Sequence, residues 1–499
     1  MNTSIKISLL SLFIIAVLVF FLIPKKEKTD HDFDEPLVFF CAAGVKLPVE
    51  AVAKEYEDEY GVKIQLQYGG SGTLLSSLRV AEVADLYLAG DFSYIDIARE
   101  NGLLAEAIPL AFMRPVIAVK KGNPKNIRTI DDLLKPGVKV ALGNPDAASI
   151  GKQTRLILQK QGSWKALAKH VEQIGVFKPT VPEIANDIKI GSVDAGIIWD
   201  ATANQYPEIE AVHLPIFDAA QKQITVGIVK SGKHPTAALR FARYLGARDR
   251  GLLKFKEHGY APVDGDKWAW KPEVVLFSGG LNRVAIEKTL ADFQKREGVT
   301  ILTTYNGCGI LVGEMKAGQR PDAYFACDQS YMNQINDLFL DESQISETDI
   351  VLLVQKGNPK NIHSLKDLAK PGVKVAVANA KYSALGGLTD RLLNEAGLYD
   401  AVRKNVTYGD APTADYLTVR VKTGREDVAI LYLANTINVR DELDVVAIDH
   451  PAALAVQPIA IGKSSDHKYL MERLVDAIKS DVSQKTFESS GFRWRVGRQ

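Results

Sequence analysis

The chain has 499 residues, of which 46% are hydrophobic, so it is long enough to bury more than one core. Lys and Arg total 61 against 60 for Asp and Glu, which excludes the basic excess that nucleic-acid binding requires. Three cysteines, Cys41, Cys308 and Cys327, are too few for a disulfide framework, and no Cys/His pairs have zinc-site spacing.

The N-terminus carries the one clear targeting signal. Residues 7–23 (ISLLSLFIIAVLVFFLI) are almost entirely apolar and are followed by Pro24 and several lysines. Such a run is at the short limit for a membrane-spanning helix. Because no small-residue cleavage site follows, we predict an uncleaved signal-anchor and tether over residues 1–35. The rest of the chain is then expected on the extracytoplasmic (periplasmic) face of the inner membrane.

A glycine-rich turn, residues 69–73 (GGSGT), lies between a predicted strand and a predicted helix. Residues 62–68 alternate apolar and polar side chains, and the segment from Thr73 onward has helical periodicity. Ser71 is expected to be the N-cap of that helix. The first N–H groups of a helix lack intrahelical partners and carry the positive end of its dipole, so this turn can hold an anion. An ordinary self-capped turn is the simpler alternative.

An internal repeat defines the domain organisation. Residues 121–127 (KGNPKNI) recur as residues 356–362, and residues 135–141 (KPGVKVA) recur as residues 370–376 at the same offset. A period of about 235 residues indicates duplication of a whole domain, because solenoid units are far shorter.

Each copy alternates short apolar strands with amphipathic helices, which predicts an α/β fold with mainly parallel sheet. A copy is large for a single sheet, so we expect two lobes around a central cleft. The predicted domains are residues 36–268 and 272–499. In the first copy the predicted strands are 37–42, 62–68, 85–89, 114–120, 138–142, 194–199 and 224–230. The predicted helices are 47–60, 73–82, 93–101, 129–134, 151–161, 164–172, 182–190 and 235–246.

Six short motifs follow one another along the first copy. They are residues 40–44 (FCAAG), 70–74 (GSGTL), 84–91 (ADLYLAGD), 141–145 (ALGNP), 194–199 (DAGIIW) and 259–262 (GYAP). In this order they resemble the periplasmic molybdate/tungstate-binding proteins of ABC importers. The resemblance covers residues 36–264, and residues 273–495 resemble the same family more loosely. It implies two tandem two-lobed domains with the type II periplasmic-binding-protein fold, each closing on a tetrahedral oxyanion and needing no other cofactor.

That family holds its anion with neutral donors, namely two serines, backbone N–H groups and one tyrosine hydroxyl. Neutral dipoles can replace the hydration shell of an anion and still release it. In the first copy the resemblance places the first serine on Gly44, which keeps only its N–H, and the second on Ser71. The backbone donors fall near Ile150 and Val181. The tyrosine falls on Trp199, whose indole N–H can still donate.

The second copy departs from the family differently. A thiol is a weak donor, so Cys308 in the place of Ser71 is expected to weaken an oxyanion site. Cys308, Cys327 and Met332 could instead bind a soft metal such as Cu(I), although free or partly buried thiols are the commoner outcome. The positions that correspond to the family's ligand-binding residues are Leu281 (or Gly280 with a one-residue gap), Cys308, Leu385, Ala414 and Tyr432.

No motif supports catalysis. Residues 149–152 (SIGK) are preceded by Asp146 where a phosphate loop needs glycine, and the eight histidines form no zinc-hydrolase pair. We therefore predict no catalytic residue and no protein-bound metal site. Two pairs of aspartates are expected to cap helices and hold hinges rather than to act as acids or bases: Asp85 with Asp91, and Asp322 with Asp328.

The sequence thus predicts a membrane-anchored solute-binding protein that is not an enzyme. It would capture a tetrahedral oxyanion, molybdate or tungstate first, and deliver it to an ABC importer permease by closure of the lobes. One alternative is a membrane-anchored ligand-sensing or docking module that binds a different small anion or, in the second domain, a soft metal. An enzyme on the same fold is a further alternative, but no nucleophile–base pair supports it.

Overall fold

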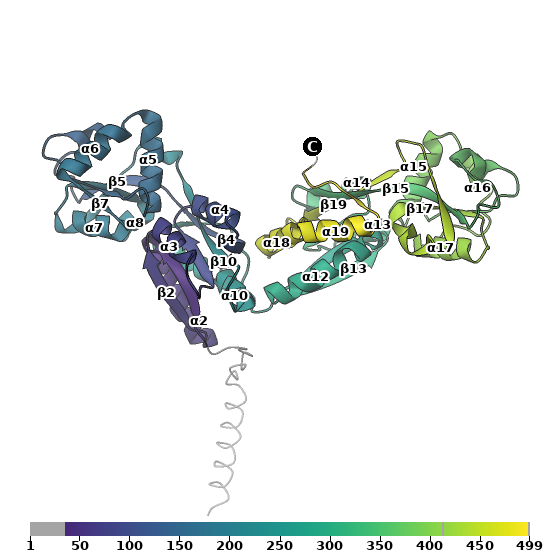
Figure 1. Cartoon of the computed structure of the whole chain (residues 1–499), viewed down its shortest axis with the longest axis horizontal. Coiled ribbons are helices and arrows are strands. Elements are labelled where there is room, and N and C mark those ends of the chain that lie inside the picture. Colours follow the sequence, from purple (N-terminus) through teal and green to yellow (C-terminus); the bar gives the residue numbers. More distant parts are fainter. Residues whose placement is uncertain (1–34, 412–413, 498–499) are drawn as a thin grey trace, which may run out of the picture.

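The computed structural model describes residues 35–411 and 414–497 of the chain (Figure 1). The predicted anchor at residues 7–23 lies outside this range. Within the described range, no helix combines the length and the apolar character needed to cross a bilayer.

The first copy folds into two lobes, each with its own sheet (Figure 1). The strands of the first lobe are β1 (Leu37–Ala42), β2 (Ile64–Gly69), β3 (Leu86–Ala89), β4 (Leu104–Met113), β10 (Lys222–Val229) and β11 (Ala261–Pro262). Those of the second lobe are β5 (Pro115–Lys120), β6 (Val140–Gly143), β7 (Val176–Lys178), β8 (Ala195–Trp199) and β9 (Ile209–Val212). The sheet orders are β11-β4-β10-β3-β1-β2 and β7-β6-β8-β5-β9.

Helices cover both faces of these sheets, as their apolar stripes require. In chain order they are η1 (Ala43–Val45), α2 (Lys46–Tyr60), α3 (Ser71–Leu78), α4 (Phe92–Glu100), η2 (Asp131–Leu134), α5 (Ser149–Gln161), α6 (Trp164–Ile174), α7 (Val181–Ile190), α8 (Asp200–Asn204), α9 (Pro215–Asp218), α10 (Pro235–Leu245) and α11 (Gly251–Glu257).

The sheets are mixed, so the expectation of mainly parallel sheet is wrong. β1 is parallel to β2 and β3, and β6 is parallel to β7 and β8. β10 is antiparallel to β3 and β4, and β5 is antiparallel to β8 and β9. The chain leaves the first lobe after β4 and returns to it on β10. These two strands run in opposite directions and are therefore antiparallel neighbours.

The chain crosses between the two lobes twice, once at Arg114 between β4 and β5 and again between β9 and β10. At the first crossing the Arg114 N–H donates to Asp200 Oδ1 at 3.1 Å, and the Asp200 N–H donates to the Arg114 carbonyl at 2.9 Å. These hydrogen bonds tie the first crossing to Asp200, the first residue of α8.

The second copy repeats the plan. Its strands are β12 (Glu273–Gly279), β13 (Thr300–Asn306), β14 (Ala323–Phe325), β15 (Ser343–Gln355), β16 (Val375–Ala376), β17 (Val428–Tyr432), β18 (Leu443–Ala447), β19 (Leu454–Ile461) and β20 (Arg493–Trp494). Its helices are η3 (Gly280–Asn282), α12 (Arg283–Glu297), α13 (Cys308–Lys316), α14 (Gln329–Met332), η4 (Asn336–Leu338), η5 (Leu365–Ala369), α15 (Ala384–Glu395), α16 (Tyr399–Arg403), α17 (Ala414–Lys422), η6 (Leu433–Val439), α18 (Lys468–Ile478) and α19 (Asp481–Ser489). One strand, β15, passes through both lobes and pairs with β19 in the first and with β17 and β18 in the second.

The most strongly repeated motif forms a structural loop. Asn123 and Asn126 have φ of 43° and 50°, and Asn358 and Asn361 have φ of 48° and 51°. Asparagine tolerates this left-handed backbone better than most residues. Asn123 Oδ1 also accepts the Ile127 N–H at 2.9 Å. The identity of the two motifs therefore follows from backbone geometry.

One aspartate of each pair caps a helix, as the sequence predicts, whereas the other accepts an N–H of a strand and not of a hinge. Asp85 Oδ2 accepts the Val38 N–H at 2.9 Å, and Asp91 caps α4 by accepting the Ser93 N–H at 3.0 Å. Asp322 and Asp328 do the same for β12 and α14 in the second copy.

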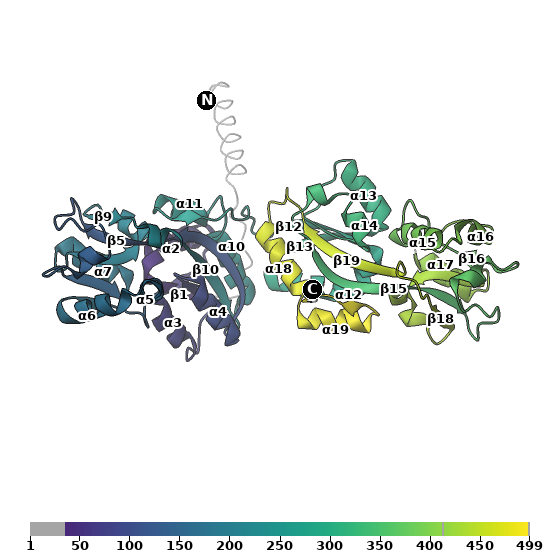
Figure 2. The ribbon, with the colours of Figure 1, turned by 90° about the horizontal axis from the view of Figure 1, so that it is seen from above.

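The two copies meet through their first lobes, at a buried ion-pair cluster. Glu297, fully buried at the end of α12, accepts from Arg243 of α10 at 3.0 Å and from Arg473 of α18 at 2.6 and 3.0 Å. Burial raises the pKa of Glu297, but the charges and hydrogen bonds of Arg473 and Arg243 outweigh it and leave that pKa below its ordinary value. The second lobes lie at opposite ends of the molecule (Figures 1 and 2).

Further contacts surround this cluster. Arg296 forms a bidentate ion pair with Glu106, with both distances 2.8 Å. Asp266 accepts the N–H groups of Tyr469 and Leu470 at the start of α18, each at 2.9 Å. The connecting segment is thus hydrogen-bonded to the second copy, and the two first lobes form one continuous unit.

We expect Glu297→Gln to destabilise the protein strongly, because it leaves two buried guanidinium groups without their carboxylate. Removal of one partner from a buried pair costs about 3–5 kcal/mol. Urea unfolding of the full chain measures the loss. The carboxylate of Glu297 has a lowered pKa in the folded state, so its contribution is present above the unfolded-state pKa and is lost as the pH falls through the folded-state value.

Glu287→Gln is the matched control on the same helix. Glu287 pairs with Arg283 at 3.0 Å, but both side chains are more than half exposed. We expect a change of about 0–1 kcal/mol. Equal effects of the two substitutions would contradict a stabilising role for the interface cluster.

Candidate ligand-binding clefts

Three helices of the first copy begin at one small cavity between the lobes. Their N-cap residues, Gly70 of α3, Ala148 of α5 and Thr180 of α7, all line it, and none makes a side-chain cap hydrogen bond. Every described residue in its lining is uncharged. The first N–H groups of a helix carry its positive dipole end, so the cavity is suited to an anion without any cationic side chain.

Four of the five predicted residues line this cavity, namely Gly44, Ser71, Val181 and Trp199. Ile150, near which the resemblance placed a backbone donor, does not itself line the cavity, but its neighbours Ala148 and Ser149 do. The cavity has a volume of about 20 Å³. One water-sized sphere needs about 10–15 Å³, so the closed form has room for about one water molecule, and a larger ligand requires the lobes to move apart.

Ser71 is not the N-cap that the sequence predicts. Gly70 takes that position, with φ −70° and ψ 147°, and Ser71 is the first helical residue. The Ser71 hydroxyl oxygen instead accepts the Gly90 N–H at 3.1 Å. A hydroxyl can accept and donate at once, so this arrangement leaves the Ser71 proton available to a ligand.

Sequence reasoning missed two hydroxyl residues of this cavity, Ser149 and Thr180. Ser149 is the first residue of α5 and is 4% exposed. A Cβ placed on Gly90 would lie 2.8 Å from Ser149 Oγ and 3.8 Å from Ser71 Oγ, so the two serines approach the same backbone position from opposite lobes. Ser149 lies just before the predicted helix 151–161, and this position could have indicated it. The resemblance assigned only a backbone donor to this region, so the Ser149 side chain was not considered.

The lobes touch across the cleft through backbone atoms. A Cβ on Gly70 would lie 2.4 Å from the Ala147 carbonyl oxygen and 2.5 Å from that of Pro179. The Gly72 N–H donates to the Ala147 carbonyl at 2.9 Å. This closed contact therefore requires glycine at position 70, because no other residue leaves room for the facing carbonyls.

The second cleft closes in the same way. A Cβ on Gly307 or on Gly309 would lie 2.1 Å from a carbonyl oxygen of the opposite lobe, and the Gly309 N–H donates to the Tyr382 carbonyl at 3.2 Å. Its cavity is larger, at about 230 Å³. The predicted residues that line it are Leu281 with Gly280, Cys308, Leu385 and Tyr432, whereas Ala414 is the first residue of α17 and borders the undescribed residues 412–413.

The chemistry of the second cleft differs from that of the first. The Cys308 sulfur accepts the Cys327 N–H at 3.2 Å, where Ser71 accepts from Gly90 in the first copy. Ala384, the first residue of α15, stands at the start of the helix that corresponds to α5. The buried Tyr432 hydroxyl has no hydrogen-bond partner among the described residues, so it can donate to a ligand.

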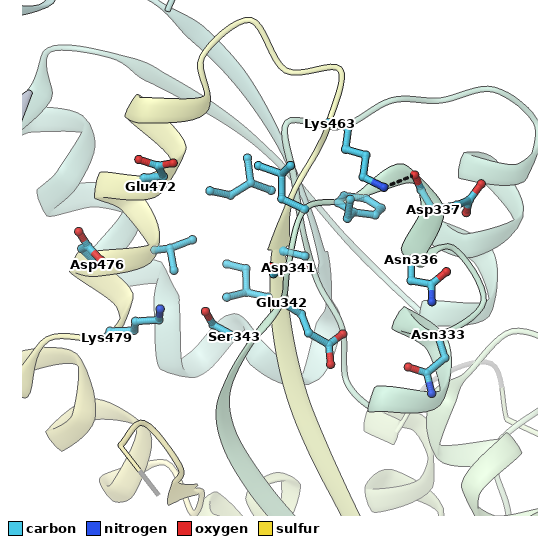
Figure 3. Close-up of a pocket in the computed structure, with 16 residues that line it drawn as sticks. Asn333, Asn336, Asp337, Asp341, Glu342, Ser343, Lys463, Glu472, Asp476 and Lys479 are labelled. Carbon is cyan, nitrogen blue, oxygen red and sulfur yellow. Dashed lines mark hydrogen bonds between the residues drawn. The ribbon is translucent and has the colours of Figure 1, made fainter. Parts of the chain in front are cut away.

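A further and larger cavity lies outside both clefts (Figure 3). It has a volume of about 900 Å³ and lies between α18 and η4, with β19 at its floor. Glu472 and Asp476 lie on the α18 side and Asp337 on the η4 side, where Lys463 Nζ donates to the Asp337 carbonyl at 2.9 Å. None of the predicted site residues lines it.

Two lobes joined by two crossings and closing on a cavity at helix N-termini define a two-lobed ligand-binding protein. The family model of bacterial extracellular solute-binding proteins matches residues 37–261 and again residues 274–493, and the chain belongs to this family. The family consists of binding proteins that act outside the cytoplasm.

Several known proteins are similar to one copy of the chain. A binding protein of Haemophilus influenzae is 26% identical over 46% of this chain and 91% of its own length. The molybdate-binding protein ModA of Mycobacterium tuberculosis is 25% identical over 44% and 82%. A thiosulfate-binding protein of Pseudomonas aeruginosa is 31% identical over 21% and 35%. The solved periplasmic molybdate-binding protein of Azotobacter vinelandii is 15% identical, with a TM-score of 0.40, over 45% of this chain and 98% of its own.

We expect Gly70→Ala to open the first cleft, because its Cβ would meet two backbone carbonyls that cannot rotate away. Hydrogen–deuterium exchange of the full chain should become about tenfold faster or more at the start of α3, where the Gly72 N–H loses its partner. Gly69→Ala is the matched control in the same turn. Its Cβ would meet only the end of the Leu74 side chain, at 3.0 Å. Unchanged exchange in Gly70→Ala would show that the lobes do not depend on this contact.

Proposed function

We propose that the first domain captures a tetrahedral oxyanion, with molybdate or tungstate as the first candidates, for an ABC importer permease. Residues 7–23 would hold the chain at the extracytoplasmic face of the inner membrane. The observation that carries this proposal is the small uncharged cavity on which the N-termini of α3, α5 and α7 converge. Similarity to molybdate-binding relatives supports the choice of ligand.

The donor set accounts for the class of anion. Ser71 and Ser149 supply hydroxyls, and no carboxylate lines the cavity to accept a proton from the ligand. Molybdate, tungstate and sulfate carry no proton at neutral pH, whereas phosphate retains one and would leave its O–H group without a strong acceptor. An unsatisfied buried donor costs about 1–3 kcal/mol. The cavity therefore favours fully deprotonated oxyanions over phosphate.

Calorimetric titration of the full chain against molybdate, tungstate, sulfate, thiosulfate and phosphate tests the proposal. Ser71→Ala and Ser149→Ala should each weaken binding by about 1–3 kcal/mol, and both variants should remain folded, as a melting curve would check. Ser77→Ala is the matched control, because the exposed Ser77 hydroxyl donates only to the Thr73 carbonyl of its own helix. Binding of none of the five anions would overturn the oxyanion proposal. Binding of sulfate or thiosulfate alone would overturn the choice of ligand.

The affinity of the first cleft should be independent of pH. Because no ionisable side chain lines it among the described residues, protonation of the protein cannot change its charge there. We expect the molybdate dissociation constant to vary by less than about twofold between roughly pH 6 and 8. A tenfold change across this range would show that a titratable group takes part in binding.

The second domain is proposed to bind a different ligand or to serve in docking or sensing. Its cavity is about 230 Å³ against about 20 Å³ in the first copy, and Cys308 and Ala384 stand where the first copy has serine hydroxyls. The stoichiometry in the same titration tests this. One oxyanion per chain is expected, and two would contradict it.

A further inference from the structure

Three linked differences between the two copies meet at one point of the second cleft. Ser71 and Gly90 of the first copy correspond to Cys308 and Cys327. Ala42, the last residue of β1, corresponds to Gly279, the last residue of β12. The strand registers support this correspondence, because Ala42 pairs with Gly69 and Gly279 pairs with Asn306. The second copy has thus gained two thiols and lost one methyl group at the same place.

The lost methyl group makes room for the thiols. A Cβ on Gly279 would lie 2.1 Å from Cys327 Sγ and 2.9 Å from Cys308 Sγ. Both sulfur atoms are therefore neighbours around the position that the Ala42 side chain fills in the first copy. The hydrogen bond from the Cys327 N–H to Cys308 Sγ, at 3.2 Å, holds the pair together.

The two thiols have different acidities. Burial raises the pKa of Cys308, but the neighbouring Cys327 thiol, the nearby Tyr324 side chain and the hydrogen bond from the Cys327 N–H outweigh it and leave that pKa below its ordinary value. The position of Cys308 at the N-terminus of α13 acts in the same direction. The hydrogen bond to Cys308, followed by burial, raises the pKa of Cys327 well above the usual range. Cys308 is therefore the more acidic thiol of the pair, and Cys327 the one that keeps its proton more strongly.

We propose that Cys308 and Cys327 are a redox-active dithiol that forms a reversible disulfide in the second cleft. The proposal goes beyond oxyanion binding and does not depend on it. Both residues line the cavity of about 230 Å³, which gives a small disulfide access when the lobes open. The extracellular family places the pair in a compartment where disulfides persist.

The reaction is thiol–disulfide exchange with a low-molecular-weight or protein disulfide as the oxidant. The Cys308 thiolate attacks one sulfur of the incoming disulfide and displaces the other as a thiolate. Cys327 then attacks Cys308 Sγ in the mixed disulfide, and its proton passes to a departing thiolate. The protein pair loses two electrons, and the incoming disulfide becomes one thiol and one thiolate, the latter taking its proton from solvent.

Equilibration of the full chain with defined ratios of reduced and oxidised glutathione tests the proposal. After acid quench and alkylation, peptide mapping should show a Cys308–Cys327 disulfide in the folded protein, while Cys41 stays reduced. Cys41 is the internal control, since it is fully buried in the first copy. Cys327→Ser should stop at a mixed disulfide on Cys308, and Cys308→Ser should leave Cys327 unreacted.

The same experiment can overturn the proposal. Two alkylatable thiols at the most oxidising ratio, and again with diamide, would exclude a redox role. A disulfide that forms only in urea, or that involves Cys41, would exclude it as well. Protection of both thiols by Cu(I) in a protein that forms no disulfide would assign the pair to a soft metal instead. None of these outcomes bears on molybdate binding by the first domain.

A backbone variant separates the geometry from the thiols themselves. Gly279→Ala restores the methyl group of the first copy and displaces Cys327 Sγ, so the disulfide should require an oxidised-to-reduced glutathione ratio at least about tenfold higher. Gly313→Ala is the matched control on α13, because nothing lies within 4 Å of its Cβ position. It should leave the midpoint ratio within about twofold. Equal midpoints for both variants would contradict the role of Gly279.

Discussion

In each domain the two lobes meet across the cleft through bare backbone. In both copies, glycines at the start of a helix let the carbonyl oxygens of the opposite lobe approach to distances that any side chain would prevent. This contact involves no side chain from the glycine turn. The residues around it have therefore been free to change, and serine has become cysteine between the copies while the two flanking glycines have stayed. The contact between the lobes is thus made by backbone atoms, whereas the side chain between the two glycines differs from one cleft to the other.

The sequence predicts the strand–helix alternation well because the buried strands are continuous apolar runs. It does not reveal β4, β7, β9 or β11, which are short or have a mixed burial that gives no clear period. It also overestimates the parallel content, since strand direction depends on where the chain crosses between lobes. The strongest repeat, which established the duplication, forms a loop fixed by left-handed asparagines. Sequence that is shared by the two copies can therefore reflect a requirement of the backbone as well as a requirement of function.

The candidate site was partly predictable. The motif order led to Gly44, Ser71, Val181 and Trp199, which the structure brings to one cavity. Their roles in binding stay a prediction. Ser149 was missed because the resemblance assigned only a backbone donor to that region, and the N-cap was misplaced by one residue because glycine and serine both suit it. The sequence did group Cys308 with Cys327, and both line the second cavity. The space left by Gly279 could not be derived from the sequence.

The crossing strands give the two domains different mechanical properties. In the first copy, β4 and β5 are separate strands that meet at Arg114, so the backbone can rotate about a single position. In the second copy, β15 runs unbroken through both lobes and is hydrogen-bonded on each side of the crossing. Opening must then twist this strand over several residues. We expect the second domain to be the stiffer of the two, with smaller and slower excursions from its closed form, even though both are built from the same ancestral unit.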